Sequence, residues 1–138
     1  MQQNKLIKVL IWVFRITASV ILLQTLFFKF TAAPESVYIF TQVGMEPWGR
    51  IGSGIVELIA ACLILYPKTT GVGAMLGLGT MSGAIFFHLT KLGISVPNSD
   101  GTNDGGLLFT YALIVFISCL ILAILYRNQI FKLVLNKF

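Results

Sequence analysis

Four long apolar runs constrain this chain more than any other feature of its sequence. They cover residues 6–30, 50–66, 70–92 and 107–126. An α-helix of about 17 to 25 residues crosses the roughly 30 Å hydrocarbon core of a bilayer. We therefore predict four membrane-spanning helices packed as one all-α bundle, with residues 1–138 forming a single membrane domain.

The composition agrees with a lipid environment. Hydrophobic residues make up 57% of the 138 residues and charged residues 11%, whereas soluble domains have about 25% charged residues. A buried core cannot account for this excess, because a chain of this size buries too little of its surface. We therefore expect the lipid bilayer to contact most of the outer surface of the protein.

The connections between the runs predict how the spans are arranged. Only a few residues separate the second run from the third, so these two helices should be antiparallel neighbours. After the first run, Pro34-Glu35-Ser36 is typical of a helix start, and we expect a short interfacial helix there. Residues 127–138 form a basic tail with apolar side chains, which predicts another helix resting on the lipid surface.

The distribution of charge predicts the orientation of the bundle. Four spans place both termini on one side, and that side carries basic residues but no acidic ones: Lys5, Lys8, Lys68, Arg127, Lys132 and Lys137. The opposite side carries Lys29, Arg50 and Lys91 together with Glu35, Glu46, Asp100 and Asp104. By the positive-inside rule, both termini are cytoplasmic and the long loops face outward. The basic residues form no polar stripe, which argues against nucleic acid as a partner.

Small and polar residues predict which faces look into the bundle, because membrane helices associate through such residues. At 100° per residue, each run has one such face. The four faces comprise Arg15, Ser19, Leu22, Leu26 and Lys29; Ser53, Gly54, Glu57, Ala60, Ala61 and Ile64; Gly73, Gly77, Met81, Ala84 and His88; and Tyr111, Val115 and Ser118. Gly79-x-x-x-Gly83 forms a neighbouring stripe that also suggests close helix packing.

Three residues of these faces are unusual inside a membrane. Counted from the outer helix ends, His88 lies about 6 Å deep, Glu57 about 10 Å and Arg15 about 20 Å. A charge near the bilayer centre costs about 2.5–3.5 kcal/mol on insertion scales, so Arg15 and Glu57 should be paired or neutralised. One interpretation is a structural Arg15–Glu57 bridge that fixes the helix register. The other, which we favour because His88 adds a third titrating group, is an outward-facing ligand or proton pocket.

The candidate residues of this pocket are Arg15, Lys29, Glu57, His88, Lys91, Asp104 and Tyr111. A metal is not expected, because the chain has one histidine, and Cys62 and Cys119 lie in different runs without a metal-binding spacing. No catalytic residue can be assigned. A quinone is the cofactor that fits best, because it needs an apolar slot and one or two hydrogen-bond donors near the interface.

Several short motifs, taken in order, resemble a known family. They are Arg15 in the first run, Phe28-Lys29-Phe30, Pro34-Glu35-Ser36, Arg50-Ile51-Gly52, Gly54-x-x-Glu57-Leu58, Gly83-Ala84 with His88-Leu89, and Asn103-Asp104-Gly105-Gly106-Leu107-Leu108-Phe109. With these motifs, nearly the whole chain resembles the DoxX-like family of small four-helix bacterial membrane proteins.

The resemblance implies a multi-pass protein of the bacterial inner membrane that is associated with redox systems. Family members include a small subunit of a thiosulfate:quinone oxidoreductase, although a shared fold does not transfer a reaction. The residues and the resemblance together predict a small integral-membrane subunit of a quinone-linked redox complex, with protein partners or further copies of itself. The alternative is a non-catalytic scaffold or assembly subunit of a membrane complex.

Overall fold

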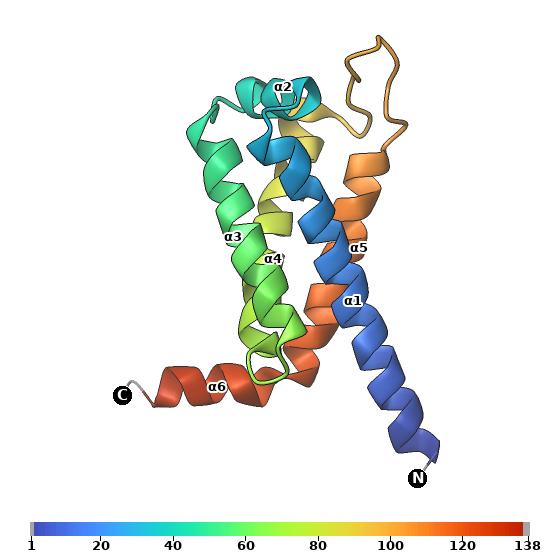
Figure 1. Ribbon diagram of the computed structural model, residues 1–138, viewed down its shortest axis with the longest axis vertical. Coiled ribbons are helices and arrows are strands. Elements are labelled where there is room, and N and C mark those ends of the chain that lie inside the picture. The colour runs from blue at the N-terminus through green and yellow to red at the C-terminus, as the bar shows by residue number, and fades with distance from the viewer. Residues whose placement is uncertain (1, 137–138) are drawn as a thin grey trace.

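The computed structural model describes residues 2–136, with side chains from Asn4 onward. These residues form helices and no β-strand (Figure 1): α1 (Gln2–Phe30), α2 (Pro34–Gln42), α3 (Trp48–Leu65), α4 (Thr70–Phe87), the π-helix η1 (His88–Leu92), α5 (Leu107–Leu125) and α6 (Arg127–Leu135). The predicted all-α bundle is confirmed.

Four stretches of helix are long and apolar enough to cross a membrane. They are Asn4–Phe30, Trp48–Leu65, Thr70–Leu92 and Leu107–Leu125, and their ends differ from the predicted spans by at most two residues. The third stretch is not one regular α-helix, because its last turn widens into η1. The sequence reading missed this change, which begins at His88.

The four spans form a ring in which each helix has two neighbours. α1 packs against α3 and α5, and α4 packs against the same two helices. The turn between α3 and α4 is short, so these two helices are antiparallel neighbours as predicted. α1 and α4 therefore lie diagonally across the bundle.

Two glycines of α4 allow its neighbours to approach closely. A Cβ atom at Gly73 would lie 2.6 Å from the backbone nitrogen of Ile64 and 2.8 Å from the carbonyl oxygen of Ala60, both in α3. A Cβ atom at Gly77 would lie 2.6 Å from the Sγ atom of Cys119 in α5. The Gly73-x-x-x-Gly77 stripe thus fixes α4 against two helices, as expected for small residues in membrane bundles.

The other glycine stripe behaves differently. Cβ atoms at Gly79 and Gly83 would meet no atom within 4 Å, so neither residue packs against a neighbouring helix. The expectation of close packing at Gly79-x-x-x-Gly83 is therefore wrong. These two glycines leave open space instead.

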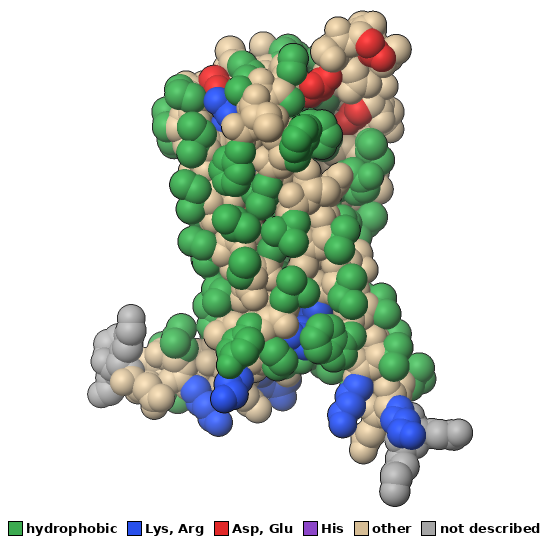
Figure 2. All heavy atoms as spheres, viewed as in Figure 1, with side chains coloured by type: hydrophobic (Ala, Val, Ile, Leu, Met, Phe, Trp, Pro, Cys, Tyr) green, Lys and Arg blue, Asp and Glu red, His purple; other side chains and the backbone are tan. Residues whose placement is uncertain are grey.

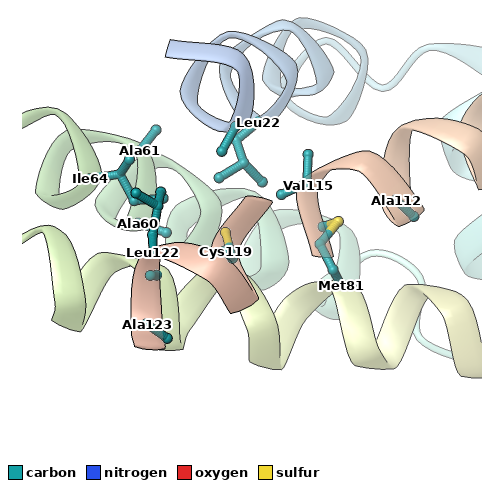
Figure 3. Packing of buried hydrophobic residues seen from close by; sticks show 12 residues of the cluster. Leu22, Ala60, Ala61, Ile64, Met81, Ala112, Val115, Cys119, Leu122 and Ala123 are labelled. Carbon is teal, nitrogen blue, oxygen red and sulfur yellow. The ribbon is translucent and has the colours of Figure 1, made fainter. Parts of the chain in front are cut away.

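The core consists of small and branched side chains from all four spans. Its members include Leu22 from α1, Ile64 from α3, Met81 from α4 and Val115 from α5 (Figure 3). The two cysteines are free, with Cys119 buried in this core and Cys62 exposed. Large hydrophobic side chains cover the outside of the spans (Figure 2), which is the surface expected of a protein surrounded by lipid.

The predicted inward faces are mostly buried. The buried members are Arg15, Ser19, Leu22, Leu26, Gly54, Glu57, Ala60, Ala61, Ile64, Gly73, Gly77, Met81, His88, Val115 and Ser118. Lys29, Ser53, Ala84 and Tyr111 are half-buried. Helical periodicity therefore located the core correctly.

The two ends of the bundle differ in structure and in charge. One end, called the α2 end below, carries α2 and the loop of residues 93–106; the other carries both termini, the α3–α4 turn and α6 (Figure 1). Acidic side chains gather at the α2 end, and most basic ones gather at the opposite end (Figure 2). The cytoplasmic placement of the termini stays a prediction that rests on this asymmetry.

The two short helices lie where the sequence predicted them. α2 covers one end of the bundle, and α6 runs across the bundle axis at the other end (Figure 1). Gln129 joins α6 to the α3–α4 hairpin, because its side chain accepts from the Gly71 backbone (2.9 Å) and donates to the Pro67 carbonyl (2.7 Å). Lys137 and Phe138, the end of the predicted tail, lie outside the described residues.

Two alanine substitutions in α4 test the packing argument. We expect Gly73→Ala to lower the free energy of unfolding by about 1–3 kcal/mol, because its methyl group meets α3 backbone that cannot move aside. Gly79→Ala is the matched control in the same helix, and should leave stability unchanged or raise it by up to about 1 kcal/mol. Thermal unfolding in detergent measures both. Equal behaviour of the two variants would contradict the assignment of the packing stripe.

Candidate functional site

A cavity of about 530 Å³ lies inside the α2 end of the bundle. Its walls come from α1, α3, α4 and α5, while α2 and the loop of residues 93–106 lie over it. Most of the lining is apolar. Its polar side chains include Gln24, Thr25, Lys29, Ser53, Glu57, His88, Asn98, Asp104 and Tyr111.

An ion pair between α1 and α3 is the main polar feature of this cavity. The Nζ atom of Lys29 lies 2.6 Å from the Oε1 atom of Glu57, and both side chains are largely buried. The Thr25 hydroxyl donates to Glu57 Oε2 (3.1 Å), and Lys29 also donates to Ser53 Oγ (3.3 Å). Both carboxylate oxygens are therefore hydrogen-bonded, which offsets the cost of placing Glu57 in an apolar region.

Arg15 is not a partner of Glu57. Its guanidinium donates to the carbonyl oxygens of Ile64 (2.8 Å) and Leu65 (2.5 Å) at the C-terminal end of α3, and its Cζ atom lies 3.8 Å from the Trp12 ring centroid. The proposed Arg15–Glu57 bridge is therefore wrong. Arg15 satisfies carbonyls that have no partner within their own helix, and its positive charge suits the negative end of the helix dipole.

Arg50 connects the beginning of α3 to the end of α1. It pairs with Glu46 (2.8 Å), and it donates a hydrogen bond to the backbone carbonyl of Lys29. Arg50 is buried, and it does not line the cavity. Its contacts hold the chain segment that carries Lys29.

His88 enters the cavity from the start of η1. Only 6% of the residue is exposed, and its Nδ1 atom lies 2.8 Å from the carbonyl oxygen of Gly93. The ring of Phe109 packs edge-on against the imidazole, with 5.5 Å between the ring centroids. His88 is thus fixed in one position by its own loop and by α5.

Asp104 organises the loop that lies over the cavity. Its Oδ1 atom accepts from the backbone nitrogens of Val96 and Gly106 (2.9 Å each), and its Oδ2 atom accepts from that of Leu108 (3.1 Å). Burial acts to raise the pKa of Asp104, but these hydrogen bonds outweigh it, so the pKa lies below its usual value. Asp104 therefore caps α5 and shapes the loop at the same time.

A contact between α2 and the loop closes the same end of the bundle. Glu35 Oε1 accepts from the Ser99 hydroxyl (2.6 Å) and from the Ser99 backbone nitrogen (3.0 Å). These hydrogen bonds lower the pKa of Glu35. Both partners are near the surface, so the contact can form and break without disturbing the core.

The structure brings together five of the seven candidate residues. Lys29, Glu57, His88, Asp104 and Tyr111 line the same cavity. Arg15 lies at the other end of α3, and Lys91 is exposed on η1 and does not line the cavity. Within the described residues, no three His, Cys, Asp or Glu side chains lie close enough to hold a metal ion.

Several polar residues of the cavity are not among the predicted pocket residues, and Thr25, Ser53 and Gln24 are examples. Thr25 and Ser53 each lie four residues before a predicted pocket residue, Lys29 or Glu57, and so share a helix face with it. Ser53 was placed on the inward face, but not in the pocket. Gln24 is an uncharged polar residue inside an apolar run, and this was the available signal for its place in the lining.

The fold and the cavity define a small helical membrane protein with a polar site at one end of a four-helix bundle. The sequence matches the DoxX-like family over residues 13–96, more than half of the chain. The chain belongs to this family. Comparison with curated proteins and with solved structures gives no significant match.

Removal of one partner of the ion pair tests its role. We expect Glu57→Leu to lower the free energy of unfolding by about 3–5 kcal/mol, because it leaves the Lys29 ammonium without its counter-charge. The double variant Lys29→Met/Glu57→Leu should recover much of this loss, because it removes both charges. Thermal unfolding of Glu57→Leu, of Lys29→Met and of the double variant gives the coupling energy between the two residues. Additive losses would show that the pair is not coupled.

The lowered pKa of Asp104 predicts a pH-dependent loop. The stabilisation by the carboxylate is complete above the pKa of an unfolded aspartate and is lost as the pH falls through the lower folded pKa. Hydrogen-exchange protection at Val96, Gly106 and Leu108 should therefore fall only below about pH 4. Asp104→Asn should reduce this protection at neutral pH. Asp100→Asn is the control and should leave the protection unchanged, because the Asp100 carboxylate accepts its hydrogen bonds from Thr102 and not from these three residues.

Proposed function

We propose that this protein is a small integral-membrane subunit of a redox complex and that it holds a quinone in the cavity at the α2 end. The observation that carries the proposal is the cavity itself. Its volume of about 530 Å³ lies in the usual range for small-molecule sites, and apolar walls surround a few convergent polar groups. A lipophilic ring with polar oxygens fits this combination.

The donors present in the cavity fit a quinone head group. The Lys29 ammonium has three N–H groups, and Glu57 and Ser53 accept two of them, so one remains. The Tyr111 hydroxyl lines the same cavity from α5. Quinone carbonyls only accept hydrogen bonds, so both groups are suitable partners. Bound there, a quinone would carry electrons that the side chains of this chain cannot carry.

The redox complex is what the resemblance to the DoxX-like family implies. The family match over residues 13–96 covers the segments around Lys29, Glu57 and His88, which line the cavity. In this proposal, the electron donor belongs to a partner protein. On the basis of the charge asymmetry, we place the α2 end at the outer, non-cytoplasmic face of the bacterial inner membrane.

Quinone retention tests this proposal. The protein is extracted from native membranes in a mild detergent, and its bound quinone is extracted and quantified. We expect stoichiometric quinone in the wild type and its loss in Tyr111→Phe, which removes a hydrogen-bond donor to a quinone carbonyl. The matched control is Tyr126→Phe, which removes the same hydroxyl group from a residue at the end of α5 that does not line the cavity. Equal quinone content in Tyr111→Phe and in the wild type would contradict the site.

The second candidate function is a scaffold that assembles other membrane proteins. Gly79 and Gly83 favour it, because both line the cavity and a Cβ atom at either residue would meet no atom within 4 Å. Such small-residue surfaces admit another membrane helix. The scaffold predicts that Gly79→Leu abolishes co-purification of a partner and that no quinone is present at any stage. Quinone in the wild type together with an intact partner complex in Gly79→Leu would exclude it.

A further inference from the structure

His88 has a fixed orientation and one nitrogen without a protein partner. Its Nδ1 atom lies 2.8 Å from the Gly93 carbonyl oxygen. Its Nε2 atom has no hydrogen-bond partner among the described residues. In the described part of the chain, every polar side-chain atom that is fully buried has a hydrogen-bond partner. Because Nε2 has none, it must retain some accessible surface. Because His88 is 94% buried and lines the cavity, Nε2 can be reached from there.

The Gly93 contact determines which nitrogen carries the proton. A carbonyl oxygen can only accept a hydrogen bond, so the Nδ1 atom must be the donor. In the neutral imidazole the other nitrogen, Nε2, then carries a lone pair and acts as an acceptor. The chemical property that His88 offers to the cavity is therefore hydrogen-bond acceptance.

The backbone around η1 keeps this arrangement in place. Gly93 has a φ of 78°, in the left-handed region that favours glycine, and this conformation ends η1 beside the His88 ring. The ring of Phe109 packs edge-on against the other side. A 180° flip of the imidazole would place the Cδ2 carbon where Nδ1 now lies, and it would break the bond to Gly93.

We propose that His88 Nε2 accepts a hydrogen bond from a hydroxyl group of the ligand, so that the cavity prefers a phenol or hydroquinone to the corresponding quinone. This inference rests on the proposed function and names the form of the ligand. A quinone oxygen has no proton to donate, so it cannot form a hydrogen bond with the lone pair of Nε2. A hydroquinone donates one hydroxyl proton to Nε2, and its second oxygen accepts from the remaining N–H of Lys29.

Stable probes separate this preference from redox chemistry. The full-length protein in lipid nanodiscs is titrated with a long-chain 4-alkylphenol and with its methyl ether, which has the same ring and alkyl chain but a methyl group in place of the hydroxyl proton. We expect the phenol to bind about tenfold more tightly than the ether, the difference that one hydrogen bond supplies. In His88→Ala the two affinities should become equal, while Leu89→Ala should keep the wild-type ratio.

The single histidine allows a direct measurement that needs no variant. His88 is the only histidine of the chain, so the ¹⁵N NMR spectrum of histidine-labelled protein reports on this ring alone. We expect a protonated Nδ1 and an unprotonated Nε2, and the Nε2 signal should shift when the phenol is added but not when the ether is added. A proton on Nε2 in the free neutral ring, or equal binding of the two probes, would overturn the proposal.

The two proposals can fail separately. Phenol preference with the expected Nε2 shift, but without quinone in the protein from native membranes, would support the acceptor role of His88 and contradict the redox function. Retained quinone with equal binding of phenol and ether would support the function and contradict the acceptor role.

Discussion

The ion pair between Lys29 and Glu57 is the interaction on which the α2 end of this protein depends. A carboxylate inside an apolar bundle is costly unless it is paired and hydrogen-bonded. The chain meets this requirement with groups from two helices: Lys29 and Thr25 from α1, and Ser53 from α3, which shares the ammonium. The same groups give an otherwise apolar cavity its polar region, so the stability of the bundle and the chemistry of the site have one origin.

Lys29 and Arg15, two cations of the bundle interior, are stabilised in different ways. The Lys29 ammonium is a compact charge and meets the Glu57 carboxylate at close range. The Arg15 guanidinium is planar with several donors, and it binds two neighbouring carbonyls at the end of α3. A lysine at position 15 would lack the planar fork of donors with which the guanidinium reaches both carbonyls.

The fold could be predicted from the sequence because the lipid environment imposes one rule: long apolar runs span the membrane, and their small and polar residues face other helices. Length and hydropathy gave the four spans, and the positions of small and polar residues gave their buried faces, from Ser19 in α1 to Ser118 in α5. The rule failed at Gly79 and Gly83, because a small residue creates a close contact only where a second helix lies opposite. Helical periodicity places a residue on a face but does not say what lies across from it.

The site was less predictable, because its contacts depend on relative depth in the bundle. Arg15 and Glu57 share the α1–α3 interface, but α1 presents a second cation, Lys29, at the level of Glu57. Arg15 lies fourteen residues earlier, about 21 Å along the helix, at the level of the last turn of α3. The widening of α4 into η1 and the Gly93 contact of His88 leave no clear pattern in the sequence.

The contacts of α1 have a mechanical consequence. The second half of this helix is attached to α3 at three levels: by Arg15 at the carbonyls of Ile64 and Leu65, by Ser19 at the carbonyl of Ala61, and by Lys29 at Glu57. Three attachments along one interface prevent the two helices from sliding or rotating against each other, so α1 and α3 move as one rigid body. Because α4 is in turn fixed against α3 and α5, a change in the volume of the cavity is expected to come from α2 and the Asp104 loop, which meet only near the surface.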